Sequence, residues 1–228
     1  MNILSICQPH FMPWIGYFLM IKRSNKFIFL DNVQYNKRSW QNRVHIRSSL
    51  YLNEKKFLSL SVKDNSRSKK INEVFLMEQN LEEFNNQIIN SYQKSKNFDF
   101  TLNFFQKFFE ENISKNLSEF NILLINEICK ILKIKLKFEK SSNFNLINYK
   151  KEYLILKILK DEKADIYLSN EGSKNYVDNH FFEKENIRVF YNEFIHPIYK
   201  QYDSKNFLPN LSIIDLLANC KEPHKFFQ

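Results

Sequence analysis

Glycine is almost absent from this chain, which contains only Gly16 and Gly172 among its 228 residues. Average usage of about 7% would place roughly sixteen glycines in a chain of this length. A sequence that otherwise avoids glycine keeps it where a side chain would not fit. Both glycines lie in unusual segments, residues 8–17 and 167–172, so we expect functional residues in these two places.

The tryptophans and prolines have a similar distribution. Trp14, Trp40, Pro9, Pro13, Pro197 and Pro209 all lie in the first 45 or the last 60 residues, and residues 41–171 contain no Gly, Pro or Trp. This middle segment is therefore predicted to be scaffold. Phe and Tyr are abundant throughout, which indicates a residue bias at ordinary positions.

The composition indicates a soluble protein. With 43% hydrophobic residues, the chain can bury a sizeable single core. The net charge of +9 is compatible with a nucleic-acid or membrane partner, but the basic residues are scattered, and anionic small molecules explain the charge as well. Nucleic acid is the less favoured partner, because basic and aromatic residues do not alternate along one element.

Cysteine usage argues against a metal or disulfide framework. Cys7, Cys129 and Cys220 are odd in number and have no CxxC or His/Cys ligand spacing. No metal site is predicted, and the compartment is expected to be reducing. The first residues lack a basic leader region, and no apolar run approaches the roughly 18 residues of a membrane span, so a cytoplasmic location without a membrane span is predicted.

Hydrophobic periodicity predicts strands alternating with helices, which favours an α/β class: a largely parallel, Rossmann-like sheet flanked by helices. The predicted strands are 2–7, 26–30, 57–62, 134–138, 165–168 and 187–191. The predicted helices are a first helix starting at Pro13, a mostly helical subregion at about 81–132, and helices at 153–159 and 211–219, the last capped by Ser212 or Asn210. We expect one domain over residues 1–228.

Ligands of such sheets bind beyond the carboxyl ends of the strands. Asp31 follows the second predicted strand, where a carboxylate can accept a proton, bind a hydroxyl or hold a turn. Arg43 and Lys37 offer charge-assisted contacts to phosphate or carboxylate, and Trp40 can stack on a base or a sugar. Gln34 and Asn42 lie in the same polar segment.

His196 is the second candidate for a catalytic base, because it precedes Pro197 and lies just beyond the strand that ends near Tyr191. Asp215, on the closing helix, is expected to cap or anchor. A thiolate nucleophile at Cys7 is disfavoured, since Cys7 ends an apolar strand without a paired His.

The chain resembles the WbqC-like protein family of bacterial polysaccharide loci. The resemblance runs almost end to end, through Gln8-Pro9, Pro13-Trp14, Gly16-Tyr17-Phe18, Asp31, Val33-Gln34-Tyr35, Trp40-Gln41-Asn42-Arg43, Tyr167-Leu168-Ser169, Gly172, Tyr176, His196-Pro197, Tyr199, Gln201, Phe207 and residues 209–217. The chain departs from the family pattern at Asn170 and at Asn219-Cys220, where the family often has Gly.

The resemblance implies an enzyme of surface-polysaccharide (O-antigen) precursor synthesis, a transferase that acylates or aminoacylates the amine of a nucleotide-linked deoxyamino sugar. The acyl donor is expected to be a thioester on a carrier protein or coenzyme A, with no tightly bound cofactor. His196 and Asp31 are the candidate bases. The residues expected to bind substrate are Gln8, Pro13, Trp14, Gly16, Gln34, Lys37, Trp40, Asn42, Arg43, Ser169, Gly172, Tyr199 and Gln201.

Two alternatives remain at this stage. The first βαβ unit also resembles the HIGH-type start of nucleotidyltransferases, where a His stands near the position of Tyr17, and residues 66–70 would then form a phosphate-binding loop. This chain lacks the HIGH histidines. The other alternative is a non-enzymatic module that binds RNA or a protein partner.

Overall fold

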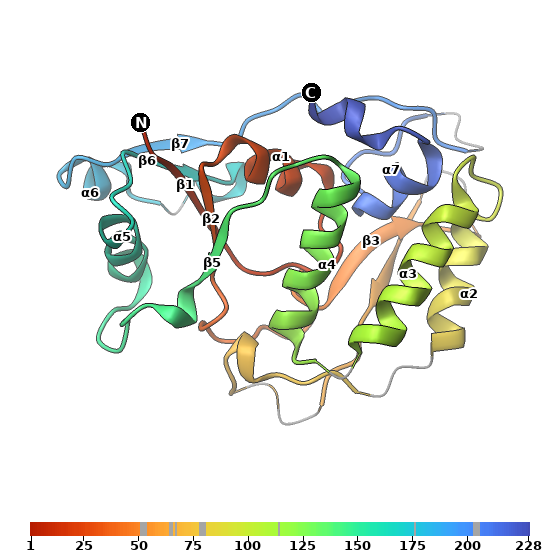
Figure 1. Cartoon of the computed structure of the whole chain (residues 1–228), viewed down its shortest axis with the longest axis horizontal. Coiled ribbons are helices and arrows are strands. Elements are labelled where there is room, and N and C mark those ends of the chain that lie inside the picture. The colour runs from red at the N-terminus through yellow and green to blue at the C-terminus, as the bar shows by residue number, and fades with distance from the viewer. Residues whose placement is uncertain are drawn as a thin grey trace.

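The computed structural model describes residues 1–50, 54–63, 66, 68–77, 81–113, 115–175, 177–202 and 206–228. Over these residues, five parallel strands form one sheet in the order β5-β2-β1-β6-β7 (Figure 1). The strands are β1 (Ile3–Cys7), β2 (Lys26–Phe29), β5 (Phe138–Lys140), β6 (Ile166–Ser169) and β7 (Arg188–Tyr191). The sequence-based expectation of a largely parallel α/β sheet is confirmed.

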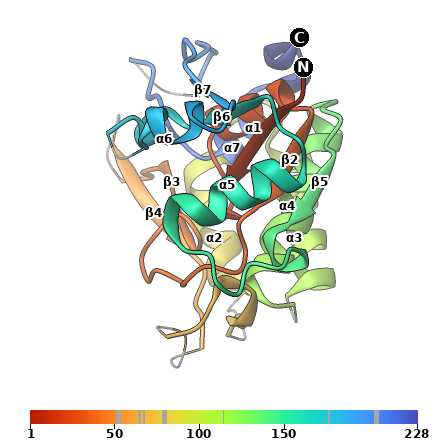
Figure 2. The same ribbon diagram turned by 90° about the vertical axis from the view of Figure 1, so that its left-hand side faces the viewer.

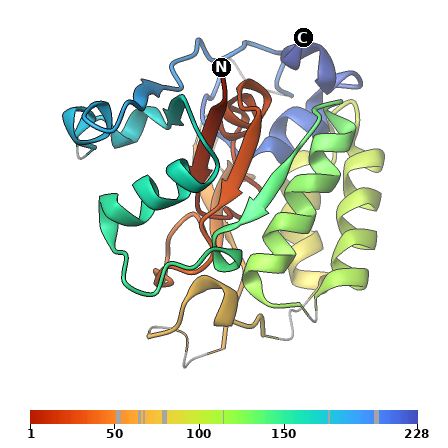
Figure 3. The ribbon, with the colours of Figure 1, turned by 60° about the vertical axis from the view of Figure 1, so that its left-hand side comes forward.

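Helices cover both faces of this sheet. On one side lie α5 (Lys151–Asp161) and α6 (Asn179–Glu183); on the other lie α1 (Ile15–Arg23), α2 (Leu81–Tyr92), α3 (Phe98–Asn112), α4 (Leu117–Ile131) and α7 (Ile213–Asn219). Figure 2 shows α5 in front of the strands, and Figure 3 shows α5 and the pair α3–α4 on opposite sides of them.

The strands feed both cores in alternation. In β2, Phe27 and Phe29 belong to the larger core with α1 and α4, whereas Ile28 faces the smaller core with α5. In β1, Leu4 and Ile6 face the smaller core and Cys7 the larger one. Because successive side chains point to opposite faces, a strand buried on both must be apolar almost throughout.

Two predicted strands differ in place. The segment predicted at 57–62 is β4 (Lys55–Ser59), which pairs with β3 (Arg43–Arg47) in a separate antiparallel ribbon. The segment predicted at 134–138 becomes a strand only from Phe138. Lys133 has φ 55°, and the Ile134 amide still hydrogen-bonds Cys129 of α4, so this stretch completes the end of the helix.

The helix ends follow local chemistry. The helical stretch predicted at about 81–132 consists of α2, α3 and α4, and the Asn116 side chain caps α4 by accepting from the Glu119 amide. Ser212, not Asn210, caps α7, since its side chain accepts from the Ile214 amide. Cys220 after α7 is extended, so this helix ends without a left-handed cap. Two residues of segments named in the sequence analysis, Arg67 of residues 66–70 and Tyr176 of the family resemblance, lie outside the described residues.

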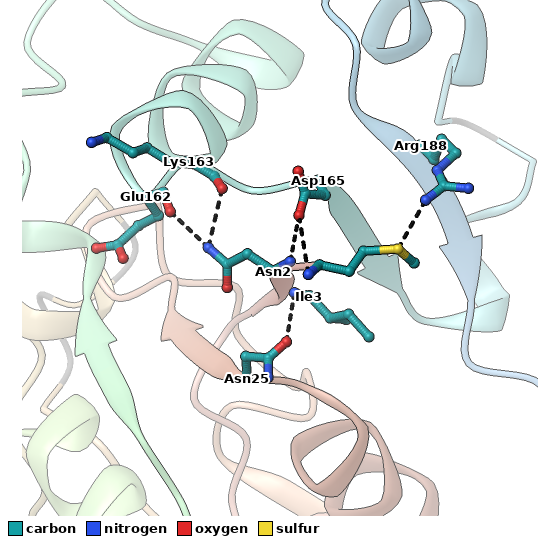
Figure 4. A network of polar contacts seen from close by, with 8 residues as sticks. Asn2, Ile3, Asn25, Glu162, Lys163, Asp165 and Arg188 are labelled. Carbon is teal, nitrogen blue, oxygen red and sulfur yellow. Dashed lines mark hydrogen bonds and ion pairs between the residues drawn. The ribbon is translucent and has the colours of Figure 1, made fainter.

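Polar contacts hold the amino-terminal edge of the sheet, opposite the strands' carboxyl ends (Figure 4). The Asn2 backbone amide donates to Asp165 Oδ2 at 2.5 Å, and its side-chain amide donates to the carbonyls of Glu162 and Lys163. The Ile3 amide donates to Asn25 Oδ1 at 2.8 Å. These contacts tie the start of β1 to the connections leading into β2 and β6.

A buried carboxylate joins the C-terminal segment to the larger core. Asp215, in the first turn of α7, has no exposed surface and accepts hydrogen bonds from Tyr199 Oη at 2.6 Å and Gln201 Nε2 at 2.8 Å. Burial raises the pKa of Asp215, while the hydrogen bonds from these two residues oppose the rise. Asp215 therefore anchors the chain, as the sequence analysis anticipated.

We expect Asp215→Ala to lower the free energy of unfolding by about 2–4 kcal/mol, since each buried donor left without an acceptor costs about 1–3 kcal/mol. The measurement is urea unfolding. Asp99→Ala is the matched control, because Asp99 also lies in a first helical turn but is exposed. Because the folded pKa of Asp215 lies above its unfolded value, the wild type's advantage over Asp215→Ala should be largest at acid pH and shrink as pH rises through the folded pKa. Equal losses in the two variants would contradict the anchoring role.

Candidate functional site

A cavity of about 1210 Å³ lies at the carboxyl ends of the central strands. Its walls come from the segment after β1, the segment after β6, the first turn of α5 and the β3–β4 ribbon. β1 connects to β2 on one side and pairs with β6 on the other, so this is the point where the strand order reverses. Open α/β sheets bind their ligands at such a point.

The cavity gathers part of the predicted site. The predicted residues that line it are Gln8, Pro13, Trp14, Gly16, Trp40, Ser169 and Gly172. The predicted residues that do not line it are Asp31, Gln34, Lys37, Asn42, Arg43, His196, Tyr199 and Gln201. Of the candidates that follow predicted strands, Gln8 and Ser169 therefore line the cavity, whereas Asp31 and His196 do not.

The segment after β1 is held by a buried tyrosine. Tyr17 Oη, on α1, donates to the Gln8 carbonyl at 2.8 Å. Burial raises the pKa of Tyr17 well above its ordinary value, so the hydroxyl keeps its proton. The phenol thus fixes the backbone immediately before Pro9.

The Gln8 side chain is also oriented. Gln41 has no exposed surface, and its Oε1 accepts from the Asn36 amide at 3.0 Å. The other end of Gln41, Nε2, therefore donates to Gln8 Oε1 at 2.9 Å. Gln8 Nε2 donates to no group among the described residues, and Gln8 lines the cavity.

Met12 is buried in the same segment with φ 38°, a backbone conformation that residues other than glycine rarely adopt. Ser212 Oγ donates to the Met12 carbonyl at 2.7 Å, and the Ile213 amide donates to the Pro13 carbonyl at 3.0 Å. The segment before α7 therefore holds the strained turn. Backbone strain of this kind gathers at functional sites.

His10 is a candidate site residue that the sequence analysis did not single out. Its ring lies against Tyr17, with centroids 5.2 Å apart, and it lines the cavity. Burial lowers the pKa of His10 to about 4, so the imidazole is neutral at pH 7. Within the described part of the chain its ring nitrogens have no hydrogen-bond partner. Its place directly after the central strand was the available signal.

The two glycines have different surroundings. A Cβ on Gly16 would lie 2.5 Å from the Trp14 ring and 2.7 Å from the Phe194 ring, so glycine lets these two rings pack over α1. A Cβ on Gly172 would meet only Asn170 Oδ1, at 3.4 Å, and its φ is not positive. Neither packing nor backbone conformation accounts for glycine at position 172.

Cys7 lines the cavity, but burial raises the pKa of its thiol to about 12. The side chain is therefore protonated at neutral pH and is a poor nucleophile. This agrees with the expectation that Cys7 fills the end of an apolar strand.

Asp31 lies outside the cavity because its carboxylate holds a turn. The side chain is 2% exposed, and Oδ1 accepts from Ser141 Oγ and the Ser142 amide, while Oδ2 accepts from Ser142 Oγ at 2.8 Å. Asp31 thus ties the end of β2 to the turn after β5. Three roles were considered for Asp31: accepting a proton, binding a hydroxyl and holding a turn. The observed contacts support the last of these.

His196 lies outside the cavity with both ring nitrogens engaged. Nε2 accepts from the Asn210 amide at 3.3 Å, which leaves the proton on Nδ1 to donate to the Pro197 carbonyl at 2.9 Å. Burial lowers the pKa of His196, and the ring packs near Phe194 and Phe207. Its contacts shape the segment that leads to Ser212.

Tyr199 and Gln201 bind the buried Asp215, and Gln201 also exchanges two hydrogen bonds with the Leu208 backbone. Asn42 donates to the Leu60 carbonyl, within the base of the ribbon. Arg43 stacks on Phe57 of the ribbon, 4.0 Å from the ring centroid.

Gln34 and Lys37 are exposed on the connection between β2 and β3. Gln34 forms an isolated antiparallel bridge with Lys70, one of the residues considered for a phosphate-binding loop. Neither residue lines the cavity, although Val33 and Trp40, which precede and follow them in the chain, do.

The cavity wall carries two lysines, Lys55 of β4 and Lys151 at the start of α5. No ion pair among the described residues involves either one. Glu152 and Glu171 also line the wall. The lysines can contact a negatively charged ligand, and no group of three or more His, Cys, Asp and Glu side chains within the described ranges is arranged to hold a metal ion.

The profile of the WbqC-like protein family matches residues 8–225, nearly the whole chain. The chain belongs to this family. It is also similar to the uncharacterized protein Rv1507c of Mycobacterium tuberculosis, with 30% identity over 223 residues that cover 96% of this chain and 94% of the relative. No solved structure matches the chain significantly. None of the described helices of this WbqC-like protein is long and apolar enough to cross a membrane.

The contrast between the two glycines of the WbqC-like chain gives a paired test. We expect Gly16→Ala to lower the free energy of unfolding by about 1–3 kcal/mol, because the added methyl group overlaps the Trp14 and Phe194 rings. Gly172→Ala should leave stability within about 0.5 kcal/mol of wild type. Chemical denaturation measures both, and equal losses would show that Gly172 also has a packing role.

The neutral state of His10 can be measured directly. We expect its ring proton signals in an NMR titration to report a neutral imidazole down to about pH 4, because burial disfavours the charged form. His10→Gln assigns the signals. The folded pKa lies below the unfolded value of 6.5, so this residue's contribution to stability should be complete above pH 6.5 and be lost as pH falls through about 4. A midpoint near 6.5 would contradict the burial of this ring.

Proposed function

We propose that this WbqC-like protein is a transferase that moves an acyl or aminoacyl group onto the amine of a nucleotide-linked deoxyamino sugar, as a step in making surface-polysaccharide precursors. One observation carries the proposal: His10, a neutral imidazole whose ring nitrogens hydrogen-bond to none of the described residues, faces a cavity at the switch point of the sheet. His10 replaces His196 and Asp31 as the candidate base, since those two side chains are engaged elsewhere.

The cavity suits a nucleotide-linked sugar in size and charge. Pockets for small ligands usually measure about 300–1,000 Å³, and this cavity, at about 1210 Å³, has room for a nucleotide sugar and part of a second substrate. Lys55 and Lys151 supply cations for the diphosphate. Gly172 leaves open the space that a Cβ would occupy, and a ligand close to the backbone there would explain a glycine that packing does not require.

The chemistry requires a base and an oxyanion donor. The amine attacks the thioester carbonyl, a C–N bond forms, and His10 accepts the proton that the nitrogen loses. The donors on Gln8 Nε2 stabilise the oxyanion of the tetrahedral intermediate. The C–S bond then breaks, and the leaving thiolate takes up the proton from His10. A carrier protein or coenzyme A supplies the thioester.

The test is the acylation of nucleoside-diphosphate amino sugars by acetyl-coenzyme A or aminoacyl thioesters, followed by mass spectrometry. We expect His10→Gln to reduce kcat by about 10²–10⁴-fold, the usual contribution of a positioned base, while calorimetry shows unchanged binding of the sugar nucleotide. His196→Gln is the matched control and should keep the wild-type kcat wherever it folds. Full activity of His10→Gln would remove the proposal's basis.

A second candidate is ATP-dependent nucleotidyl transfer. The strand order favours it, because numbering the sheet strands in chain order gives 3-2-1-4-5, the first five positions of the 3-2-1-4-5-6 order of dinucleotide-binding doubly wound folds. The neutral His10 follows the first strand in this scheme as well. Release of pyrophosphate from ATP, with no acyl transfer from any thioester, would favour this candidate over the first.

A further inference from the structure

The β3–β4 ribbon presents a stack of rings on the face that is not packed in the core. His45 and Phe57 are paired across the strands with ring centroids 4.2 Å apart, and Trp40 meets His45 edge-on at 5.3 Å. The Arg43 guanidinium covers the Phe57 ring at 4.0 Å. We call Trp40, His45, Phe57 and Arg43 the aromatic platform.

Two aromatic side chains of the platform are exposed, although burying large apolar rings would stabilise the fold more. Trp40 is 48% exposed and Phe57 is 43% exposed, whereas Val44 and Leu58, on the opposite face of the ribbon, are buried in the core. The cross-strand pair of His45 and Phe57 stabilises the ribbon. Trp40 lies outside both strands, so ribbon pairing does not explain its position.

The platform belongs to the wall of the cavity. Trp40 and His45 both line it. The Trp40 carbonyl accepts from the Phe11 amide at 2.9 Å, which ties the indole's backbone to the segment that carries His10. This main-chain hydrogen bond therefore fixes the position of Trp40 relative to His10.

The platform also carries uncompensated positive charge. Arg43 and Lys55 lie on its face and form none of the ion pairs among the described residues, and the buried Arg43 Nε has no acceptor there. The pKa of His45 is lowered first by burial and then by the charges of Lys55 and Arg43. A ligand with a flat ring and a linked negative group complements this surface, because the ring can stack on the aromatic side chains and the negative group can contact the cations.

We propose that the aromatic platform is the base subsite of the cavity: the nucleobase of a nucleoside diphosphate stacks on Trp40, and its phosphates reach Lys55. The inference rests on the proposed function in assuming a nucleotide substrate, but it holds for either transfer reaction. It orients the substrate with the base over the ribbon, leaving the attached sugar on the His10 side. A single exposed Trp fits one base rather than a nucleic-acid strand.

Trp40→Ala tests the platform against two probes, uridine 5′-diphosphate and inorganic pyrophosphate, by calorimetry. We expect Trp40→Ala to weaken binding of the nucleotide by about 5- to 150-fold, the range that a stacked base contributes, and to leave pyrophosphate binding unchanged. Trp40→Phe, which keeps a ring, should retain most of the affinity. Phe100→Ala is the matched control, since Phe100 is also 48% exposed but lies on α3, away from the cavity.

Intrinsic fluorescence gives an independent measurement, because Trp14 and Trp40 are the chain's only tryptophans. Uridine 5′-diphosphate should quench wild-type emission, and the quenching should be lost in Trp40→Phe. Ribose 5-phosphate should not reproduce it.

Three outcomes would overturn the inference. These are undiminished nucleotide affinity in Trp40→Ala, an equal loss for pyrophosphate, and equal quenching by ribose 5-phosphate, which would place a sugar on the indole. Each leaves the proposed function intact, because a nucleotide or its phosphates still bind. Absence of binding by both uridine 5′-diphosphate and pyrophosphate would overturn the proposed function as well.

Discussion

The central strand β1 has both faces buried, and the positions of the two cores and of the cavity follow from this burial. Leu4 and Ile6 pack toward α5 and α6, while Cys7 joins the larger core with α1 and α4. A strand with no solvent-facing side has a fixed register, because a one-residue slip would exchange its two faces. Its carboxyl end therefore delivers the segment from Gln8 onward to one place in the sheet.

Beyond that strand, the cavity wall is preorganised by hydrogen bonds within the chain. Tyr17 fixes the backbone before Pro9, and Gln41 orients the amide of Gln8. Ser212 holds the strained Met12 from the far end of the chain. These hydrogen bonds are already formed in the protein without substrate. Binding a substrate therefore requires little further ordering of these residues, which lowers the entropic cost of association.

The proposed chemistry and the platform place two halves of a substrate on different parts of the fold. His10 comes from the α/β sheet, and Trp40 comes from the connection to the ribbon; the hydrogen bond between Phe11 and Trp40 joins them. The M. tuberculosis relative aligns along nearly the whole of both chains, so the comparison of the two proteins extends over the sheet and the ribbon together.

The sequence by itself determined the strand–helix alternation, the parallel sheet and the segments around Gly16 and Gly172, because periodicity and glycine scarcity are local signals. Only the tertiary structure decided which polar residues meet. Asp31 and His196 follow predicted strands, yet distant partners at residues 141–142 and 210 engage them. His10 carries no motif, and its neutrality arises from burial in the folded chain, which no local pattern encodes.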